Sequence, residues 1–310
     1  MVQNFLKDYL KKAQRMWSQF TPRTHLVLIL AAVLVVSLGV GLGITFSSLR
    51  NAQLNAIYAQ SSQVDEVIVD IDEVLTVGLT ESSPEQIAAA QKELTVAQRQ
   101  IDDAIKSAEK LKKKASEKEK AHLELVQNSL GVRAYILSVA PELLGANKQA
   151  AQSLVYAAQG WKYLQNGVRK SEQAQKVQAG GDNAQLNESI TLHDQARDDF
   201  SLAQANIQKA QAALPEVNLS SYLDYIVHCE EMSKAAQDAD RALLKNDKKQ
   251  AKKFIKKYNK LSEEAAILAH ENLKPLNSAI MATYKEKTEA LSNQYFSARE
   301  KVSSIDRQIR

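Results

Sequence analysis

The sequence predicts an all-α fold, with one N-terminal transmembrane helix followed by an extracytoplasmic array of long helical hairpins in a coiled-coil-like bundle. The composition favours helices. The 310 residues include ten Gly and five Pro, and aromatic residues make up 6%, whereas Ala, Gln, Lys, Glu and Leu are abundant. A single stretch, residues 26–46, is apolar except for Ser37 and Thr45. Beyond it, apolar residues recur at intervals of three and four, the spacing of an amphipathic helix.

The apolar stretch predicts a transmembrane helix over residues 25–47. At ~1.5 Å per residue it spans about 31 Å, the hydrocarbon thickness of a bilayer. The first 47 residues hold five Lys or Arg and one acid, so they account for the whole net charge of +4. The positive-inside rule then places residues 1–24 in the cytoplasm and residues 48–310 outside the plasma (inner) membrane. The run exceeds the about 7–15 residues of a cleaved signal peptide, which favours an uncleaved signal-anchor over that alternative.

The leader, residues 1–24, predicts a cytoplasmic basic amphipathic helix. Its apolar residues recur at three- and four-residue steps and form one face, while its lysines occupy much of the other. Such a helix lies in the membrane interface with its Trp at headgroup depth. The residues expected at the membrane interface are Lys7, Lys11, Lys12, Arg15, Trp17 and Arg23. A topogenic flank without a further task and a cytoplasmic docking helix are the alternatives.

Small side chains one turn apart lie within the predicted span. Gly39 and Gly43 form a GxxxG pair, and Ser37 and Gly41 form a second pair of small residues. Such pairs let two transmembrane helices approach closely. The pattern leaves open that two copies self-associate as a homodimer through this face.

Residues 48–83 predict a juxtamembrane helix and linker. Gly78 and the polar segment TESS end the helix. The apolar stripe expected to be buried, with one polar break, is Leu54, Ile57, Ser61, Val64, Ile68, Ile71 and Leu75.

Residues 84–274 predict a bundle of helical hairpins. Its first helix begins at Pro84, with Ser83 as N-cap and Gln86 completing a capping box. The lysine-rich run at 110–120, which we interpret as a solvated hairpin turn, contains a second capping box, Ser116 and Glu119. The longest regular stripe of the chain is Ile87, Ala90, Leu94, Ala97, Ile101, Ala104, Ala108, Leu111 and Ala115. Its Ala-rich seam favours close antiparallel packing.

Prolines and glycines predict the later breaks. Pro141 ends a helix at Ala140, Pro215 ends another, and Pro275 opens a long C-terminal helix within residues 275–310. Between them we expect helices at 146–178, 183–213, 220–245 and 248–273, the first two separated by Gly180-Gly181-Asp182. The stripe expected to be buried in the second of these is Leu186, His193, Ala196, Phe200, Ala203, Ile207, Ala210 and Leu214.

Residues 235–265, AAQDADRALLKNDKKQAKKFIKKYNKLSEEA, resemble a tetratricopeptide unit in the turn and in the placement of alanines. The chain lacks that family's repeated Trp-Leu-Gly-Tyr pattern and has no 34-residue period. No property of the family is therefore transferred to this chain.

Side chains capable of catalysis or metal binding do not converge in the sequence. Cys229 has no partner for an intramolecular disulfide and reads as a small buried hydrophobe. The histidines are isolated, and His193 on its apolar stripe is predicted to be a core histidine with its hydrogen bonds satisfied. No zinc, nucleotide or nucleophile-elbow motif occurs.

Consecutive carboxylates such as Asp198-Asp199 are interpreted as part of solvent-exposed helix faces. An acidic cluster over residues 65–73 leaves weak divalent-cation binding as an alternative to an exposed face. We therefore predict no catalytic, metal or cofactor site.

These observations predict a non-enzymatic, single-pass membrane scaffold or tether that binds other envelope or cell-surface proteins. The alternative is an extracytoplasmic ligand-sensing bundle that signals through a partner. The expected partners are the lipid bilayer and other proteins. Nucleic acid is not expected, because the basic excess belongs to the membrane flank.

Overall fold

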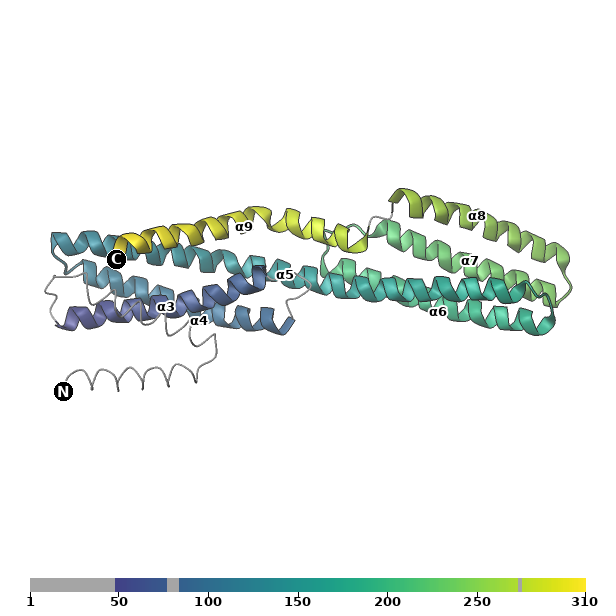
Figure 1. Cartoon of the computed structure of the whole chain (residues 1–310), viewed down its shortest axis with the longest axis horizontal. Coiled ribbons are helices and arrows are strands. Elements are labelled where there is room, and N and C mark those ends of the chain that lie inside the picture. The colour runs from purple at the N-terminus through teal and green to yellow at the C-terminus, as the bar shows by residue number, and fades with distance from the viewer. Residues whose placement is uncertain (1–47, 77–83, 273–274) are drawn as a thin grey trace, which may run out of the picture. The chain divides into compact units, whose positions relative to one another are not determined.

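The computed structural model describes residues 48–76, 84–272 and 275–310, and these are helical apart from short turns (Figure 1). In chain order the helices are α3 (Ser48–Thr76), α4 (Pro84–Lys112), α5 (Glu117–Gln178), α6 (Asn183–Ala213), α7 (Ser220–Leu244), α8 (Lys248–Asn272) and α9 (Leu276–Ile309). The all-α prediction is confirmed for this part of the chain.

The predicted transmembrane helix, the six interface residues and the four small residues of the span lie in residues 1–47, outside the described part. Within the described ranges, no helix combines the length and the apolarity that a membrane crossing requires.

Most predicted helix ends and buried stripes are confirmed. α4 begins at Pro84, and its stripe is buried from Ile87 to Ala108. The stripe of α3 is buried except at its end, where Val74 replaces the half-buried Leu75. The whole predicted stripe of α6, from Leu186 to Leu214, is buried. Helical periodicity predicts the buried residues of these helices correctly because each helix has one apolar face.

The predicted break at Pro141 is wrong, because α5 runs without interruption from Glu117 to Gln178. A proline inside a helix has no N–H for the carbonyl four residues earlier, here that of Leu137. That carbonyl instead accepts a hydrogen bond from Gln98 Nε2 of α4, at 3.1 Å. Leu137 is fully buried, so the bond satisfies an acceptor that water does not reach. A neighbouring helix therefore makes the proline tolerable.

The chain divides into two compact units, and each is described by itself. Unit 1 contains residues 48–62, 101–133 and 299–310 of the described chain. Its buried Arg133 donates to Asp306 Oδ2 at 2.6 Å, and Ser129 Oγ donates to Asp306 Oδ1 at 2.5 Å. The C-terminal turns of α9 are thereby fixed to α5 by charge-assisted hydrogen bonds.

A second polar contact in unit 1 joins α3 to α5. Tyr58 Oη lies 3.0 Å from His122 Nε2. Burial raises the pKa of Tyr58 to about 12, with a smaller contribution from the Asp306 carboxylate. Burial also lowers the pKa of His122. Both groups are therefore neutral at pH 7, and the contact is a hydrogen bond between uncharged groups.

Unit 2 contains residues 63–100 and 134–298. Within it α9 meets α3 through the buried Tyr295, whose hydroxyl donates to Asp72 Oδ1 at 2.8 Å. α5 meets α3 through Asn147 Nδ2, which donates to the carbonyl of Val74 at 3.1 Å. The apolar core of this unit includes Phe200, Ile207 and Ile226, which are nearly inaccessible to solvent.

Glycines bring α5 and α6 close together. A Cβ at Gly167 would lie 2.6 Å from Phe200 Cε1, and a Cβ at Gly160 would lie 2.8 Å from Ile207 Cδ1. Both distances are shorter than Cβ contacts allow, so a larger residue at either position would force Phe200 or Ile207 to move. The turn that connects α5 to α6 contains Gly181, whose φ is +78°. Asp182 then caps the N-terminus of α6 through a capping box with Gln185.

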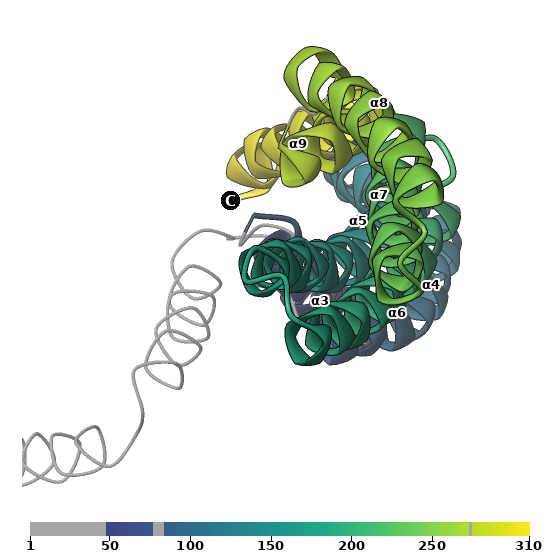
Figure 2. The same ribbon diagram turned by 90° about the vertical axis from the view of Figure 1, so that its right-hand side faces the viewer.

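Helix α7 lies between α6 and α8 (Figure 2). The turn from α7 to α8 places Asn246 in the left-handed region at φ 57°, a conformation that Asn tolerates. Asp247 then caps α8 by accepting a hydrogen bond from the backbone N–H of Gln250 at 2.9 Å. The helices α5, α6, α7 and α8 surround the cavity described next.

Candidate functional site

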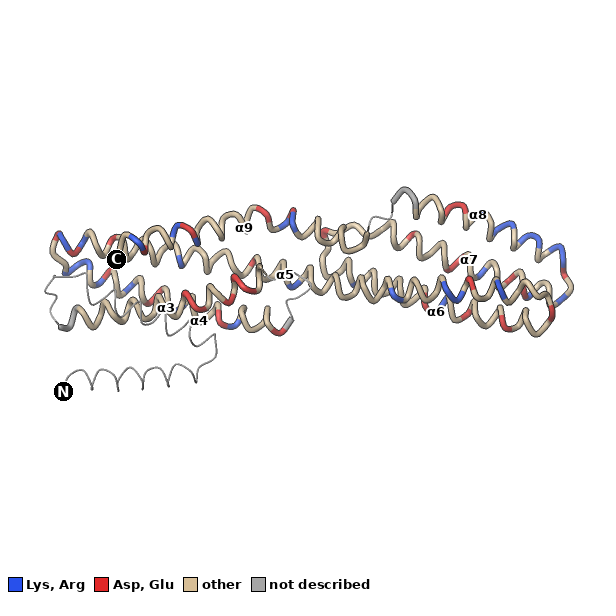
Figure 3. The backbone as a smooth tube through the Cα atoms, viewed as in Figure 1, with Lys and Arg blue, Asp and Glu red and all other residues tan. Residues whose placement is uncertain are grey.

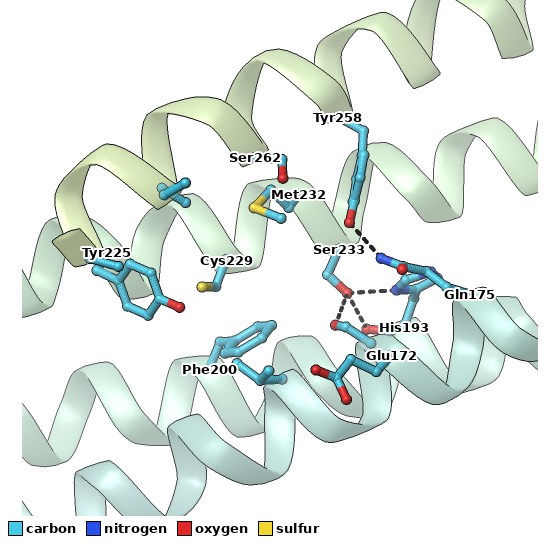
Figure 4. Close-up of a pocket in the computed structure, with 15 residues that line it drawn as sticks. Glu172, Gln175, His193, Phe200, Tyr225, Cys229, Met232, Ser233, Tyr258 and Ser262 are labelled. Atoms are coloured by element: carbon cyan, nitrogen blue, oxygen red, sulfur yellow. Dashed lines mark hydrogen bonds between the residues drawn. The ribbon is translucent and has the colours of Figure 1, made fainter.

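A cavity of about 340 Å³ lies among α5, α6, α7 and α8 of unit 2 (Figure 4). Its lining residues are Val168, Ser171, Glu172, Gln175, His193, Phe200, Tyr225, Cys229, Met232, Ser233, Tyr258, Ser262, Ala265, Ala266 and Ala269. The exposed ones, among them Glu172 and Ala266, belong to α5 and α8, so the mouth lies between these two helices. This volume is at the lower end of the range for small-molecule sites, about 300–1,000 Å³.

One part of the wall is apolar. Phe200 from α6, Met232 from α7 and Ala265 from α8 contribute carbon and sulfur surface. Cys229 adds to this surface, since burial raises the pKa of its thiol to about 11 and keeps it protonated. A protonated, buried thiol is a poor nucleophile, which agrees with the predicted role as a small buried hydrophobe.

Another part of the wall is polar and centres on Ser233 of α7. Ser233 Oγ lies 2.9 Å from His193 Nδ1 and 3.4 Å from Ser171 Oγ. It donates to the His193 carbonyl at 3.3 Å, so the single hydroxyl proton is used and Nδ1–H is the donor toward Ser233. His193 Nε2 therefore carries a lone pair, and it is buried without a hydrogen-bond partner.

The imidazole of His193 is neutral at physiological pH. Burial lowers its pKa to about 4, although the neighbouring Asp194 acts in the opposite direction. The prediction that His193 is a satisfied core histidine is confirmed for its burial, since the side chain has no accessible surface, and is wrong for its hydrogen bonding, since Nε2 has no partner. Its unpartnered Nε2 is unusual, because buried polar atoms in proteins generally have a partner.

Hydroxyl groups of two tyrosines complete the wall. Tyr258 Oη of α8 accepts a hydrogen bond from Gln175 Nε2 of α5, which joins these helices beside the mouth. Burial raises the pKa of Tyr258 despite this bond. The pKa of Tyr225 is raised to about 12, chiefly by burial and then by Cys229. Both phenols are therefore uncharged at pH 7.

A buried carboxylate lies near one end of α7 and does not line the cavity. Asp240 accepts hydrogen bonds from Ser189 Oγ, at 2.7 Å, and from Gln178 Nε2. Burial raises its pKa, while the two hydrogen bonds lower it. Asp240 has no solvent-accessible surface, so it acts as a structural link among α5, α6 and α7.

Lysines are concentrated along the first half of α8 (Figure 3), and together they form an exposed lysine face. Its members, all exposed, are Lys248, Lys249, Lys252, Lys253, Lys256, Lys257 and Lys260. At about 100° per residue they fall on one half of the helix, opposite the buried Ala251 and Ala265. Among the described residues, carboxylates lie near two of the lysines, Glu231 at 3.6 Å from Lys257 and Glu264 at 3.5 Å from Lys260.

The other residues singled out from the sequence have varied outcomes. Asp199 is not solvated as expected: it is 8% exposed and pairs with Lys170 of α5 at 2.7 Å. Its neighbour Asp198 is exposed as predicted. Ser116 N–H donates to Glu119 Oε2 at 2.6 Å, which is one of the two bonds expected of that capping box. In the described ranges, no three His, Cys, Asp or Glu side chains are grouped to hold a metal ion.

Sequence reasoning missed both the cavity and the lysine face. Lysine pairs repeated at four-residue intervals, 248/249, 252/253 and 256/257, signal the lysine face. Over residues 48–310 the basic and acidic residues balance, 35 of each, so the average charge of this region conceals the local excess. The cavity has no such signal, because its lining residues come from four helices spread over about a hundred positions.

No protein-family model, curated protein or solved structure matches the chain.

Proposed function

We propose that the protein is a non-enzymatic, single-pass membrane-anchored helical scaffold, whose external region binds an acidic surface of another envelope or cell-surface protein. The observation that carries the proposal is the lysine face of α8. Five of its seven lysines have no carboxylate within ion-pair distance among the described residues. A concentration of one charge on a rigid helix attracts a partner surface of the opposite charge.

The helices that carry and support this face suit a scaffold. α8, and α7 on which it packs, are each 25 residues long, so at about 1.5 Å per residue each extends about 38 Å. Buried alanines such as Ala239 of α7 and Ala251 of α8 let the two helices pack closely, which supports presentation of the lysine face in one fixed orientation. The proposed anchor is the apolar stretch at residues 26–46, with residues 1–24 in the cytoplasm.

Charge reversal tests the partner surface. In one variant Lys248, Lys252, Lys253 and Lys256 become Glu. The matched control reverses the same number of exposed lysines elsewhere: Lys110, Lys113, Lys114 and Lys118. Crosslinking and pull-down from native membranes should recover the same partner with the wild type and the control, and lose it with the α8 variant. Equal recovery with both variants would overturn the proposed docking surface.

Cysteine labelling tests the membrane orientation. A membrane-impermeant maleimide added to intact cells should label an exposed external site, Ser116→Cys, and should leave Lys7→Cys unlabelled. Native Cys229 is buried and contributes little background. Labelling of Lys7→Cys alone would reverse the proposed topology.

The cavity favours a second candidate function, ligand sensing. Its walls come from four helices, so an occupant changes the contacts of all four at once.

A further inference from the structure

The cavity has the dimensions and the walls of a small-molecule site. About 340 Å³ accommodates a compact organic molecule, and a peptide helix about 10 Å across does not fit. The apolar wall, formed in part by Phe200 and Met232, favours a hydrocarbon or aryl body. The cavity also opens to solvent between α5 and α8, so an entry path exists.

Charge in the lining selects the polar end of the ligand. Glu172 is the one charged side chain among the lining residues, and the lining includes neither Lys nor Arg. It is exposed at the mouth and has no ion-pair partner in the described chain. Hydroxyl groups such as that of Tyr258 donate as well as accept, and the neutral His193 adds an unpartnered acceptor at Nε2. The Glu172 carboxylate therefore decides the preferred charge of the ligand. An anion finds no positive group there.

Aromatic rings add to the attraction for a cation. Tyr225 and Tyr258 also line the cavity, and the face of an aromatic ring attracts an ammonium group within about 6 Å. The lysine face does not oppose this, since its residues lie on the side of α8 away from Tyr258. Salt screens charges over a Debye length of about 8–10 Å, close to a helix diameter.

We infer that the cavity binds a small organic ammonium compound, with its apolar body against Phe200 and its ammonium group toward Glu172. The inference specifies the ligand class for the second candidate function, ligand sensing. It rests on that function only for what binding does in the cell, and not for binding itself. Failure of binding would leave the partner assay on the lysine face unaffected.

Isothermal titration calorimetry of the full chain in zwitterionic lipid nanodiscs tests the inference with three probes that share a phenyl group and differ in charge. These are 2-phenylethylammonium, the neutral 2-phenylethanol and the anion phenylacetate, with empty nanodiscs as the control for partition into lipid. We expect 2-phenylethylammonium to bind, 2-phenylethanol to bind about two- to fivefold more weakly, and phenylacetate to bind about tenfold more weakly or worse.

Two pairs of measurements assign the binding to this cavity. Ala266→Trp fills the mouth and should abolish heat from 2-phenylethylammonium. Ile267→Trp, the next position on α8, is exposed and does not line the cavity, so it should bind as the wild type does. Glu172→Gln should weaken 2-phenylethylammonium about two- to fivefold and leave 2-phenylethanol unchanged.

Other results overturn the inference. Absence of binding by all three probes, or undiminished binding to Ala266→Trp, removes the site. Phenylacetate binding as tightly as 2-phenylethylammonium, or Glu172→Gln without effect on 2-phenylethylammonium, removes the selectivity for cations. Circular dichroism of each variant at 222 nm checks that its helices are intact.

Discussion

Gln98→Ala removes the donor that compensates for Pro141 inside α5. The Leu137 carbonyl then has neither the amide of residue 141 nor the Gln98 side chain as a donor, and its residue is fully buried. An unsatisfied buried acceptor costs about 1–3 kcal/mol. We expect the free energy of unfolding to fall by about 1–2 kcal/mol, because Gln98 itself is half-buried and water reaches part of the site after truncation.

The double-mutant cycle with Pro141→Ala isolates this mechanism. Alanine restores the N–H at residue 141, so the Leu137 carbonyl regains its helical partner. In that background we expect Gln98→Ala to cost at most about 0.5 kcal/mol, which gives a coupling energy of about 1 kcal/mol. Pro141→Ala alone should stabilise the protein, since its side chain is exposed and an interior proline is costly.

Thermal unfolding of the full chain in detergent micelles, followed at 222 nm, is the assay. At about 2–4 °C per kcal/mol for a domain of this size, a loss of about 1–2 kcal/mol means that Gln98→Ala should lower Tm by about 2–8 °C. The matched control is Gln100→Ala on the same helix, whose side chain donates to Gln63 at the exposed surface at 2.8 Å, and it should change Tm by about 1 °C at most. An equal loss from Gln98→Ala with and without Pro141 would refute the reasoning.

Two further predictions concern the packing beside the cavity and its histidine. Gly167→Ala places a Cβ 2.6 Å from the Phe200 ring and should destabilise by about 1–3 kcal/mol in urea unfolding. Gly131→Ala, with nothing within 4 Å of its Cβ, should stabilise by up to about 1 kcal/mol, and equal effects of the two would contradict the close approach. Because the pKa of His193 falls from 6.5 unfolded to about 4 folded, the unfolded chain binds the extra proton first as pH drops. The free energy of unfolding is therefore not reduced by His193 above pH 6.5. It falls as the pH is lowered from 6.5 to about 4, by about 3 kcal/mol in all. His193→Gln should show a correspondingly smaller loss between these two pH values, and an unchanged slope would count against a buried neutral imidazole.

The helices with one apolar face followed directly from the sequence. The α6 stripe from Leu186 to Leu214 and the breaks at Gly181 and Pro215 needed only helical periodicity and backbone rules. Each of these signals is local, since the residues concerned lie within a few turns of one another. The cap at Asp182 is local for the same reason.

The failures arose where a partner far along the chain decides the outcome. Pro141 looks like a helix end until Gln98, on another helix, supplies the missing donor. Asp199 looks solvated until Lys170 of α5 pairs with it. Local patterns carry no information about which helix lies opposite, so neither contact was predictable from periodicity.

The sequence by itself determined that the chain is helical, where most helices begin and end, and which residues face inward, because backbone propensity and apolar period act over a few residues. It also supports the prediction of a membrane anchor. Tertiary structure alone decided that α5 continues through Pro141, that Asp199 is buried, and that residues such as Phe200, His193 and Tyr258 surround one cavity. The physical reason is that hydrogen-bond compensation and cavity formation depend on pairs of helices, and the relative placement of helices is set by packing across the whole unit.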